Sequence, residues 1–270
     1  MAERLLLVGF GNMGQALVNG WLGHGREART IAVVDPRPEA LAAAAALGIA
    51  ASADWPAAGR EQSADVVVLA VKPAQLEDVL QHYRILSGRS LFLSIAAGKT
   101  IAGLAAVLGA EAAIVRAMPN TPAAIGRGVT ALCSNDHVTA DRRALCTTLM
   151  SAIGSVEWLD DERSMDAVTA VSGSGPAYVL LLIECLIDAG QQLGLDQALA
   201  ARLAVGTVAG TGLYAEQSDA DAAELRHAVT SPGGTTEAAL DVLMSEGQLA
   251  ELMGRAVRAA AKRSGELSSE

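Results

Sequence analysis

Short apolar runs alternate with longer helical segments over the first 160 residues or so of the chain. Six of these runs are predicted strands, at residues 5–8, 31–35, 66–71, 91–95, 112–115 and 129–133. The 66–71 run has no polar alternation, which is typical of a strand covered on both faces. Helices are predicted between the runs at 12–22, 38–47, 76–83 and 100–108. This alternation with short connections predicts an α/β fold built on a doubly wound parallel sheet.

The pattern changes after about residue 160, where only helical periodicity remains. Helices are predicted at 177–193, 196–214, 221–229, 235–244 and 246–263, and the polar tail 264–270 is expected to fray. The 177–193 helix is apolar on nearly every face, so it must be surrounded. A helical domain of about 100 residues offers few ways to surround this helix. We therefore expect the helix to be buried against a second subunit. The predicted domains are therefore residues 1–160 and an all-helical dimerisation domain at residues 161–270.

Composition removes several classes of function. The chain carries a net charge of −10 with three lysines, which is unlike a nucleic-acid-binding surface and disfavours anionic membranes. Cys133, Cys146 and Cys185 have no metal-like spacing, so we expect buried apolar side chains and no metal site. The longest apolar stretch, 177–183, is shorter than a membrane span. These observations predict a cytoplasmic protein without a membrane or nucleic-acid partner.

A glycine-rich turn directly follows the first predicted strand and opens the first predicted helix. Its sequence is Gly9, Phe10, Gly11, Asn12, Met13 and Gly14. Gly9 allows a tight turn, Gly11 leaves room for a phosphate near the backbone, and Gly14 lets the helix pack closely on the strand. The free N–H groups of the helix N-terminus then face the phosphates. This arrangement predicts a Rossmann dinucleotide-binding site in residues 1–160.

Further candidates for cofactor binding follow the later strands. Asp35 lies at the distance expected of a ribose-binding carboxylate, which favours NAD, whereas Arg37 is suited to the 2′-phosphate of NADP. From spacing alone both cofactors remain open. At other predicted strand ends the candidates are Ala70, Val71, Lys72, Pro73, Ala96, Ala97 and Asn120.

Two clusters of glycines and hydroxyls in the second domain are candidates for substrate binding. One contains Ser231, Gly233, Gly234, Thr235 and Thr236, and the other contains Ser172, Gly173 and Ser174. Each precedes a predicted helix, where N–H groups and the helix dipole can hold a small carboxylate without a charged side chain.

The histidines suggest which bond is reduced. His24, His82, His137 and His227 all lie outside the glycine clusters. Reduction of a ketone usually needs a positioned acid, whereas a protonated imine already carries its positive charge. A site of hydroxyls without histidine therefore favours a cyclic imine, with Lys72 as an alternative acid.

Taken together, these segments resemble the Δ1-pyrroline-5-carboxylate reductase family. The matching segments, in the order in which they occur in that family, are residues 9–14, 70–73, 94–98, 118–122, 166–178 (DAVTAVSGSGPAY) and 229–236 (VTSPGGTT). The last two are the most specific, and the segments are spread over residues 9–236, most of the length of the chain. Lys99 departs from the family pattern, where an aliphatic residue is usual, and the His-Pro pair often found near residues 218–223 is absent.

The resemblance implies reduction of pyrroline-5-carboxylate to L-proline, the last step of proline biosynthesis, with hydride passing from nicotinamide C4 to imine C5. It implies that residues 231–236 bind the substrate carboxylate and that the Thr236 hydroxyl, the candidate catalytic group, faces the ring nitrogen. It also implies a homodimer, with five dimers as a possible ring. NADPH is the expected cofactor, and NADH stays open because of Asp35.

Two other functions compete with this prediction. A 3-hydroxyacid dehydrogenase related to 6-phosphogluconate dehydrogenase needs a lysine early on the long helix, and residues 176–214 contain none. A non-catalytic NAD(P) sensor needs an inert substrate loop, which three hydroxyls on a double-glycine helix start argue against.

Overall fold

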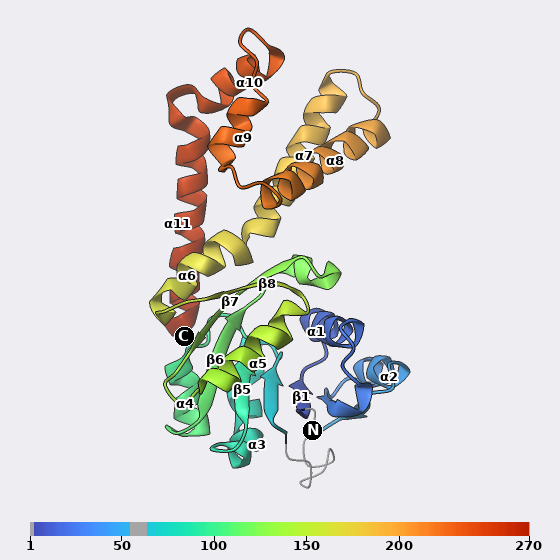
Figure 1. The fold of residues 1–270 in the computed structure, drawn as a ribbon, viewed down its shortest axis with the longest axis vertical. Coiled ribbons are helices and arrows are strands. Elements are labelled where there is room, and N and C mark those ends of the chain that lie inside the picture. The colour runs from blue at the N-terminus through green and yellow to red at the C-terminus, as the bar shows by residue number, and fades with distance from the viewer. Residues whose placement is uncertain (1–2, 55–63, 270) are drawn as a thin grey trace. The chain divides into compact units, whose positions relative to one another are not determined.

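The structure is a computed structural model that describes residues 3–54 and 64–269, in two compact units. The first unit comprises Met1–Gly173 with Ala260–Glu270, and the second comprises Ser174–Ala259. The first unit contains an eight-stranded sheet in the order β3-β2-β1-β4-β5-β6-β7-β8 (Figure 1). The strands are β1 (Leu5–Val8), β2 (Ile31–Val34), β3 (Ala50–Ser52), β4 (Val66–Leu69), β5 (Leu91–Ser94), β6 (Ala113–Met118), β7 (Gly128–Ser134) and β8 (Gly154–Trp158).

Helices cover both faces of this sheet, which explains the continuous apolar runs. In β1, Leu5 and Leu7 pack on one face with side chains of α1, α2 and α5, whereas Leu6 and Val8 pack on the other with side chains of α3 and α4. Both faces of a doubly wound sheet are buried, so the strands need no polar alternation. The helices are α1 (Asn12–Gly23), α2 (Pro38–Ala46), α3 (Pro73–Tyr83), α4 (Ile101–Leu108) and α5 (Ala140–Ser151).

The predicted doubly wound fold is confirmed, with one antiparallel pair. Strand β7 runs antiparallel to β6 because their connection is a short 3-10 turn, Thr121–Ile125, and not a crossover helix. The other strand pairs are parallel. Strands β3 and β8 and helix α5 were not predicted. β3 has two exposed residues and one partly buried residue, and β8 has no fully buried ones, so neither presents a buried apolar run.

The second unit is entirely helical, as predicted. Its helices are α7 (Gly175–Gln192), α8 (Gln197–Glu216), α9 (Ala222–Ala228), α10 (Thr235–Met244) and the first part of α11 (Gln248–Ser269). Helices α7 and α8 pack closely where a Cβ on Gly190 would lie 3.3 Å from the Cβ of Ala200. A short helix, α6 (Met165–Val168), and a π-helical turn, Thr169–Gly173, end the first unit before α7.

Large apolar side chains are exposed along the helices of the second unit. None of the 18 residues of α7 is buried, and Leu180 and Leu181 are each 58% exposed. Two helical segments, Glu162–Gln192 and Gln197–Glu216, are long and apolar enough to cross a membrane by length and composition alone. These segments are longer than the apolar run at 177–183 because they include interruptions by polar residues. Cys185 is exposed, contrary to prediction, whereas Cys133 and Cys146 are buried.

The C-terminal segment also differs from expectation. Helix α11 continues to Ser269 instead of fraying after Arg263, and Ser264 is buried. The first unit extends to Gly173 and includes Ala260–Glu270, so its limits differ from the expected boundary at residues 160 and 161. Side-chain contacts between α6 and the end of α11 hold both segments within the first unit.

Candidate functional site

The turn after β1 requires glycine at two positions for packing. Gly9 has φ +94°, and a Cβ there would lie 2.6 Å from the carbonyl oxygen of Ala70. A Cβ on Gly14 would lie 2.5 Å from the carbonyl oxygen of Gly9. These two glycines bring the start of α1 against the ends of β1 and β4.

Gly11 is different, because nothing in the fold requires it. It has φ −75°, and no protein atom lies within 4 Å of the position of its Cβ. It is the N-cap of α1 and provides no side-chain hydrogen bond to the first turn. The residues present thus fit a dinucleotide, since a pyrophosphate can approach the Gly11 backbone and the N–H groups of the α1 N-terminus.

Asp35 follows β2 and is almost fully buried, with 3% of its surface exposed. Its carboxylate accepts hydrogen bonds from Phe10 N (2.7 Å), Arg37 N (3.0 Å), Arg37 Nε (2.9 Å) and Arg37 Nη2 (2.8 Å). Burial acts to raise the pKa of Asp35, but the hydrogen bonds from the Arg37 side chain and from the two N–H groups outweigh it and lower the pKa. The two residues that sequence spacing set as alternatives therefore form one ion pair.

A cavity of about 650 Å³ opens between the ends of β1, β2 and β4 and helix α3. Such a crevice, at the carboxyl ends of the strands where the strand order reverses, is where ligands bind in doubly wound sheets. The predicted residues that line it are Gly9, Gly11, Asp35, Arg37, Ala70, Val71 and Lys72.

Several lining residues were not predicted from the sequence. They are Val8, Val34, Pro36, Ala53, Asp54, Gln75, Val79, His82 and Tyr83. Gln75, Val79 and His82 share one face of α3, and their spacing of four and three residues behind Lys72-Pro73 was a usable signal. His82 thus lines the candidate cofactor site, although it lies outside the glycine clusters in the sequence. Burial and the nearby Asp54 raise the pKa of the Tyr83 hydroxyl.

The remaining predicted cofactor residues do not line this cavity. Phe10 is buried in the hydrophobic core, and Met13 packs against this core. Pro73 is the first residue of α3. Asn120 uses its side chain within the protein, since Nδ2 donates to Ser172 O at 3.0 Å and Oδ1 accepts from Val129 N at 2.9 Å. Asn12 and Ala97 are exposed, and Ala96 is buried behind β5.

The predicted substrate cluster at residues 172–174 lies partly in the π-helical turn. Ser172 donates its hydroxyl to the carbonyl oxygen of Val168 at 3.0 Å. A Cβ on Gly173 would lie 2.7 Å from Cε of Met118, so a larger residue there would displace the end of the Met118 side chain. Ser174 is the N-cap of α7 and makes no capping hydrogen bond.

The second cluster forms the entry to α10. Gly233 has φ +68°, Gly234 is the N-cap without a side-chain cap, and Gly234 N donates to Ser231 O at 3.0 Å. Glu237 accepts a hydrogen bond from Gly233 N at 2.6 Å. The carboxylate of the first turn of α10 therefore folds back onto the loop, which itself has no charged side chain. Thr236 is half-buried beside it.

The described part of the chain contains no group of three or more His, Cys, Asp or Glu side chains that could hold a metal ion. Burial raises the pKa of the Cys133 thiol to about 11 and that of Cys146 to about 12. These two thiols are therefore protonated core side chains at neutral pH.

Comparisons with known proteins match both parts of the chain. Residues 162–267 match the domain family "Pyrroline-5-carboxylate reductase dimerisation", and residues 4–98 match "NADP oxidoreductase coenzyme F420-dependent". The pyrroline-5-carboxylate reductase of Pseudomonas aeruginosa is 42% identical, over 99% of this chain and 97% of its own.

Solved structures agree. The pyrroline-5-carboxylate reductase of Coxiella burnetii has a TM-score of 0.94 and 37% identity, with 99% of each chain covered. The pyrroline carboxylate reductase of Plasmodium falciparum with NADP bound has a TM-score of 0.85 and 30% identity, with 98% of each chain covered. The chain therefore belongs to the pyrroline-5-carboxylate reductase family of oxidoreductases.

Proposed function

We propose that this protein reduces the cyclic imine Δ1-pyrroline-5-carboxylate to L-proline with NADPH, as the last step of proline biosynthesis. The observation that carries the proposal is the 42% identity to a pyrroline-5-carboxylate reductase over 99% of the chain. The open backbone at Gly11 and the cavity beside it support a dinucleotide as the reductant. When bound, the reduced nicotinamide supplies the hydride that reaches C5 of the imine.

The Asp35–Arg37 pair supports NADPH as the preferred cofactor. Asp35 already accepts four hydrogen bonds, whereas the Arg37 side chain is 49% exposed at the cavity. The negative charge of Asp35 is compensated by its ion pair with Arg37, and the exposed guanidinium of Arg37 is suited to bind a 2′-phosphate. NADH can still be used if the ribose hydroxyls share the Asp35 carboxylate with Arg37.

Residues 231–236 are proposed to bind the substrate carboxylate, with Ser172, Gly173 and Ser174 as further contacts. The N–H groups at the start of α10 and the hydroxyls of Ser231 and Thr235 supply hydrogen bonds without a cation. The Thr236 hydroxyl is proposed to hydrogen-bond the ring nitrogen, which keeps the protonated imine oriented for hydride addition.

A homodimer is proposed to cover the exposed apolar face of the second unit. The dimerisation family matches residues 162–267, and large apolar residues in this region are exposed, including Leu180, Leu181, Leu182, Leu186 and Leu203. Exposed apolar patches of this kind mark protein or membrane contacts, and the dimerisation match favours a second copy in a cytoplasmic enzyme. A ring of five dimers is the higher assembly that we propose to test by mass.

The direct experiment follows the absorbance of reduced nicotinamide with purified protein and glutamate semialdehyde equilibrated with pyrroline-5-carboxylate. We expect oxidation of NADPH that depends on substrate, with formation of proline and a higher kcat/KM than for NADH. A parallel reaction with the six-membered cyclic imine measures specificity. Tight binding of NADPH without any turnover would contradict the proposal and indicate a cofactor sensor.

A further inference from the structure

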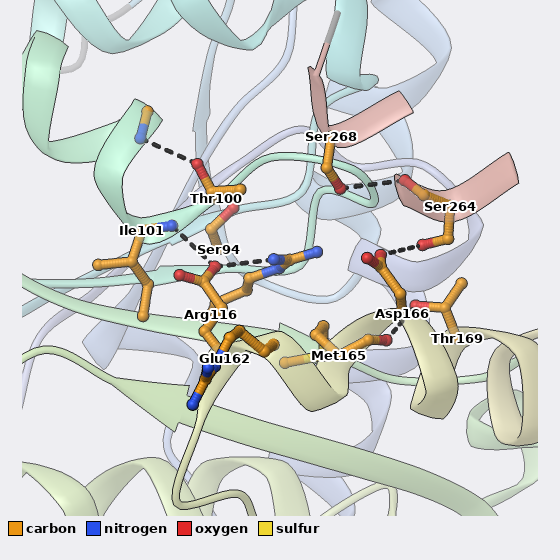
Figure 2. A network of polar contacts seen from close by, with 12 residues as sticks. Ser94, Thr100, Ile101, Arg116, Glu162, Met165, Asp166, Thr169, Ser264 and Ser268 are labelled. Carbon is orange, nitrogen blue, oxygen red and sulfur yellow. Dashed lines mark hydrogen bonds and ion pairs between the residues drawn. The ribbon is translucent and has the colours of Figure 1, made fainter. Parts of the chain in front are cut away.

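The end of α11 makes a specific contact with α6. Ser264 is buried, and its hydroxyl donates to Oδ1 of Asp166 at 2.6 Å. Figure 2 shows Ser264 and Ser268 on α11 and Asp166 on α6. The Ser268 hydroxyl instead donates to the carbonyl oxygen of Ser264 at 3.0 Å, within its own helix. The Ser264 hydroxyl therefore ties α11 to another element, and the Ser268 hydroxyl does not.

Leu267 lies against the loop that follows β5. A Cβ on Gly98 would lie 3.2 Å from both the Cβ and the carbonyl oxygen of Leu267. Gly98 has φ +72°, a left-handed conformation that glycine adopts readily. The backbone of residues 94–98, here called the β5 loop, thus packs so closely on the C-terminal helix that a Cβ on Gly98 would force a shift of a few tenths of an ångström between them.

The chain beyond the β5 loop is also fixed. Glu162 Oε1 accepts hydrogen bonds from Ile101 N at 2.9 Å and from Arg116 Nη1 at 2.7 Å (Figure 2). Lys99, directly after the loop, forms an ion pair with Glu77 of α3 at 2.9 Å. The loop is therefore held on one side by the C-terminal helix and on the other by the start of α4.

This loop does not line the candidate cofactor cavity itself, but it follows the strand next to β4, which ends at the cavity. Ser94 pairs with Leu69 in the parallel register of β5 and β4, and Ile95 N donates to Leu69 O at 3.0 Å. Ala70, the next residue of the neighbouring strand, lines the cavity. The carboxyl ends of parallel neighbours lie at one edge of the sheet, so the β5 loop leaves the sheet beside the cavity wall.

We propose that Ser264 and Leu267 are positioning residues for the cofactor. They fix the position of the β5 loop relative to the neighbouring cofactor cavity, and this position favours binding of NADPH. The inference rests on the proposed function, because it concerns the same cofactor site. It assigns a role to the C-terminal segment through the loop, without direct contact between that segment and the substrate. Loss of the contact weakens binding of NADPH more than it slows the chemical step.

The first test compares Ser264→Ala with its matched control, Ser268→Ala. The dissociation constant for NADPH is measured without substrate, from the fluorescence of the reduced nicotinamide, and thermal unfolding is recorded in parallel. We expect about tenfold weaker NADPH binding for Ser264→Ala and no change for Ser268→Ala. A tenfold change corresponds to the loss of about one hydrogen bond to a charged group. Asp166→Asn keeps an acceptor for Ser264 and should bind NADPH more tightly than Asp166→Ala.

A second test acts on the loop side and does not depend on Ser264. Gly98→Ala and Gly88→Ala place a methyl group at similar positive φ values, +72° and +82°, but a Cβ on Gly88 meets no atom within 4 Å. Both variants place alanine at a similar positive φ, so Gly88→Ala controls for backbone strain, and only the new Cβ of Gly98→Ala presses on Leu267. We expect weaker NADPH binding for Gly98→Ala, and wild-type binding with lowered stability for Gly88→Ala.

The inference would be overturned if Ser264→Ala and Gly98→Ala lost thermal stability but bound NADPH like the wild type, because the contacts would then be structural only. Equal weakening in the two controls would also overturn it. Failure of the proposed function looks different: the wild type itself would bind NADPH yet form no proline.

Discussion

Replacing Gly11 with alanine separates ligand binding from folding at the glycine turn. The added methyl group meets no protein atom within 4 Å, and φ at this position is −75°. Alanine is a poorer N-cap than glycine but restricts the unfolded chain, and these effects oppose one another. We therefore expect the free energy of unfolding to change by about 1 kcal/mol or less.

The same methyl group occupies space that the pyrophosphate needs. Forcing a methyl group into a close contact costs about 1–3 kcal/mol, which corresponds to roughly 5- to 150-fold weaker binding of NADPH. The assay is a fluorescence titration of NADPH, run beside chemical unfolding of the same preparation.

Gly9→Ala is the control, because that glycine is required by the fold itself. Its φ is +94°, and the new Cβ would lie 2.6 Å from the carbonyl oxygen of Ala70. The left-handed conformation and the collision together should destabilise the protein by about 3 kcal/mol. The reasoning is refuted if Gly11→Ala binds NADPH like the wild type, or if it unfolds as readily as Gly9→Ala.

Four further predictions concern the site and the assembly. Thr236→Ala should lower kcat roughly tenfold or more in steady-state assays, and unchanged kinetics would remove this hydroxyl from the mechanism. Asp35→Ser should raise kcat/KM for NADPH relative to NADH, and an unchanged ratio would mean that the carboxylate does not face the ribose. The lowered pKa of Asp35 means that its contribution to stability is present above its ordinary value of 3.8 and is lost as the pH falls through the lower folded value. The destabilisation of Asp35→Asn in urea titrations should therefore shrink with acidification, and a constant difference would argue against the ion pair. Sedimentation should show no stable monomer, and a monomer at sub-micromolar concentration would contradict the dimer.

Most of the structure that could be predicted was predicted from local sequence patterns. The first strand was predicted at residues 5–8, where β1 lies, and the helix after the double glycine was predicted at residues 235–244, where α10 lies. In both, an apolar pattern and an adjacent glycine turn point to the same boundaries. The roles of Gly9 and Gly14 also follow from the turn sequence, because close approach of α1 to β1 requires them.

Long-range contacts could not be predicted in this way. Ser264 was assigned to a frayed tail because its partner, Asp166, lies 98 residues earlier and no local pattern links the two. Spacing left Asp35 and Arg37 as alternatives, whereas the fold joins them in one ion pair. Glu237 did have a local signal, since an acid three residues after an N-cap commonly accepts from the N–H groups before a helix.

A nicotinamide bound in the first unit is proposed to deliver hydride to a cyclic imine. The most direct test uses NADPH carrying deuterium at the transferred C4 position and analyses the proline by mass spectrometry and NMR. The account predicts one deuterium per proline, located at C5. Proline without deuterium, or oxidation of NADPH without proline, would contradict it.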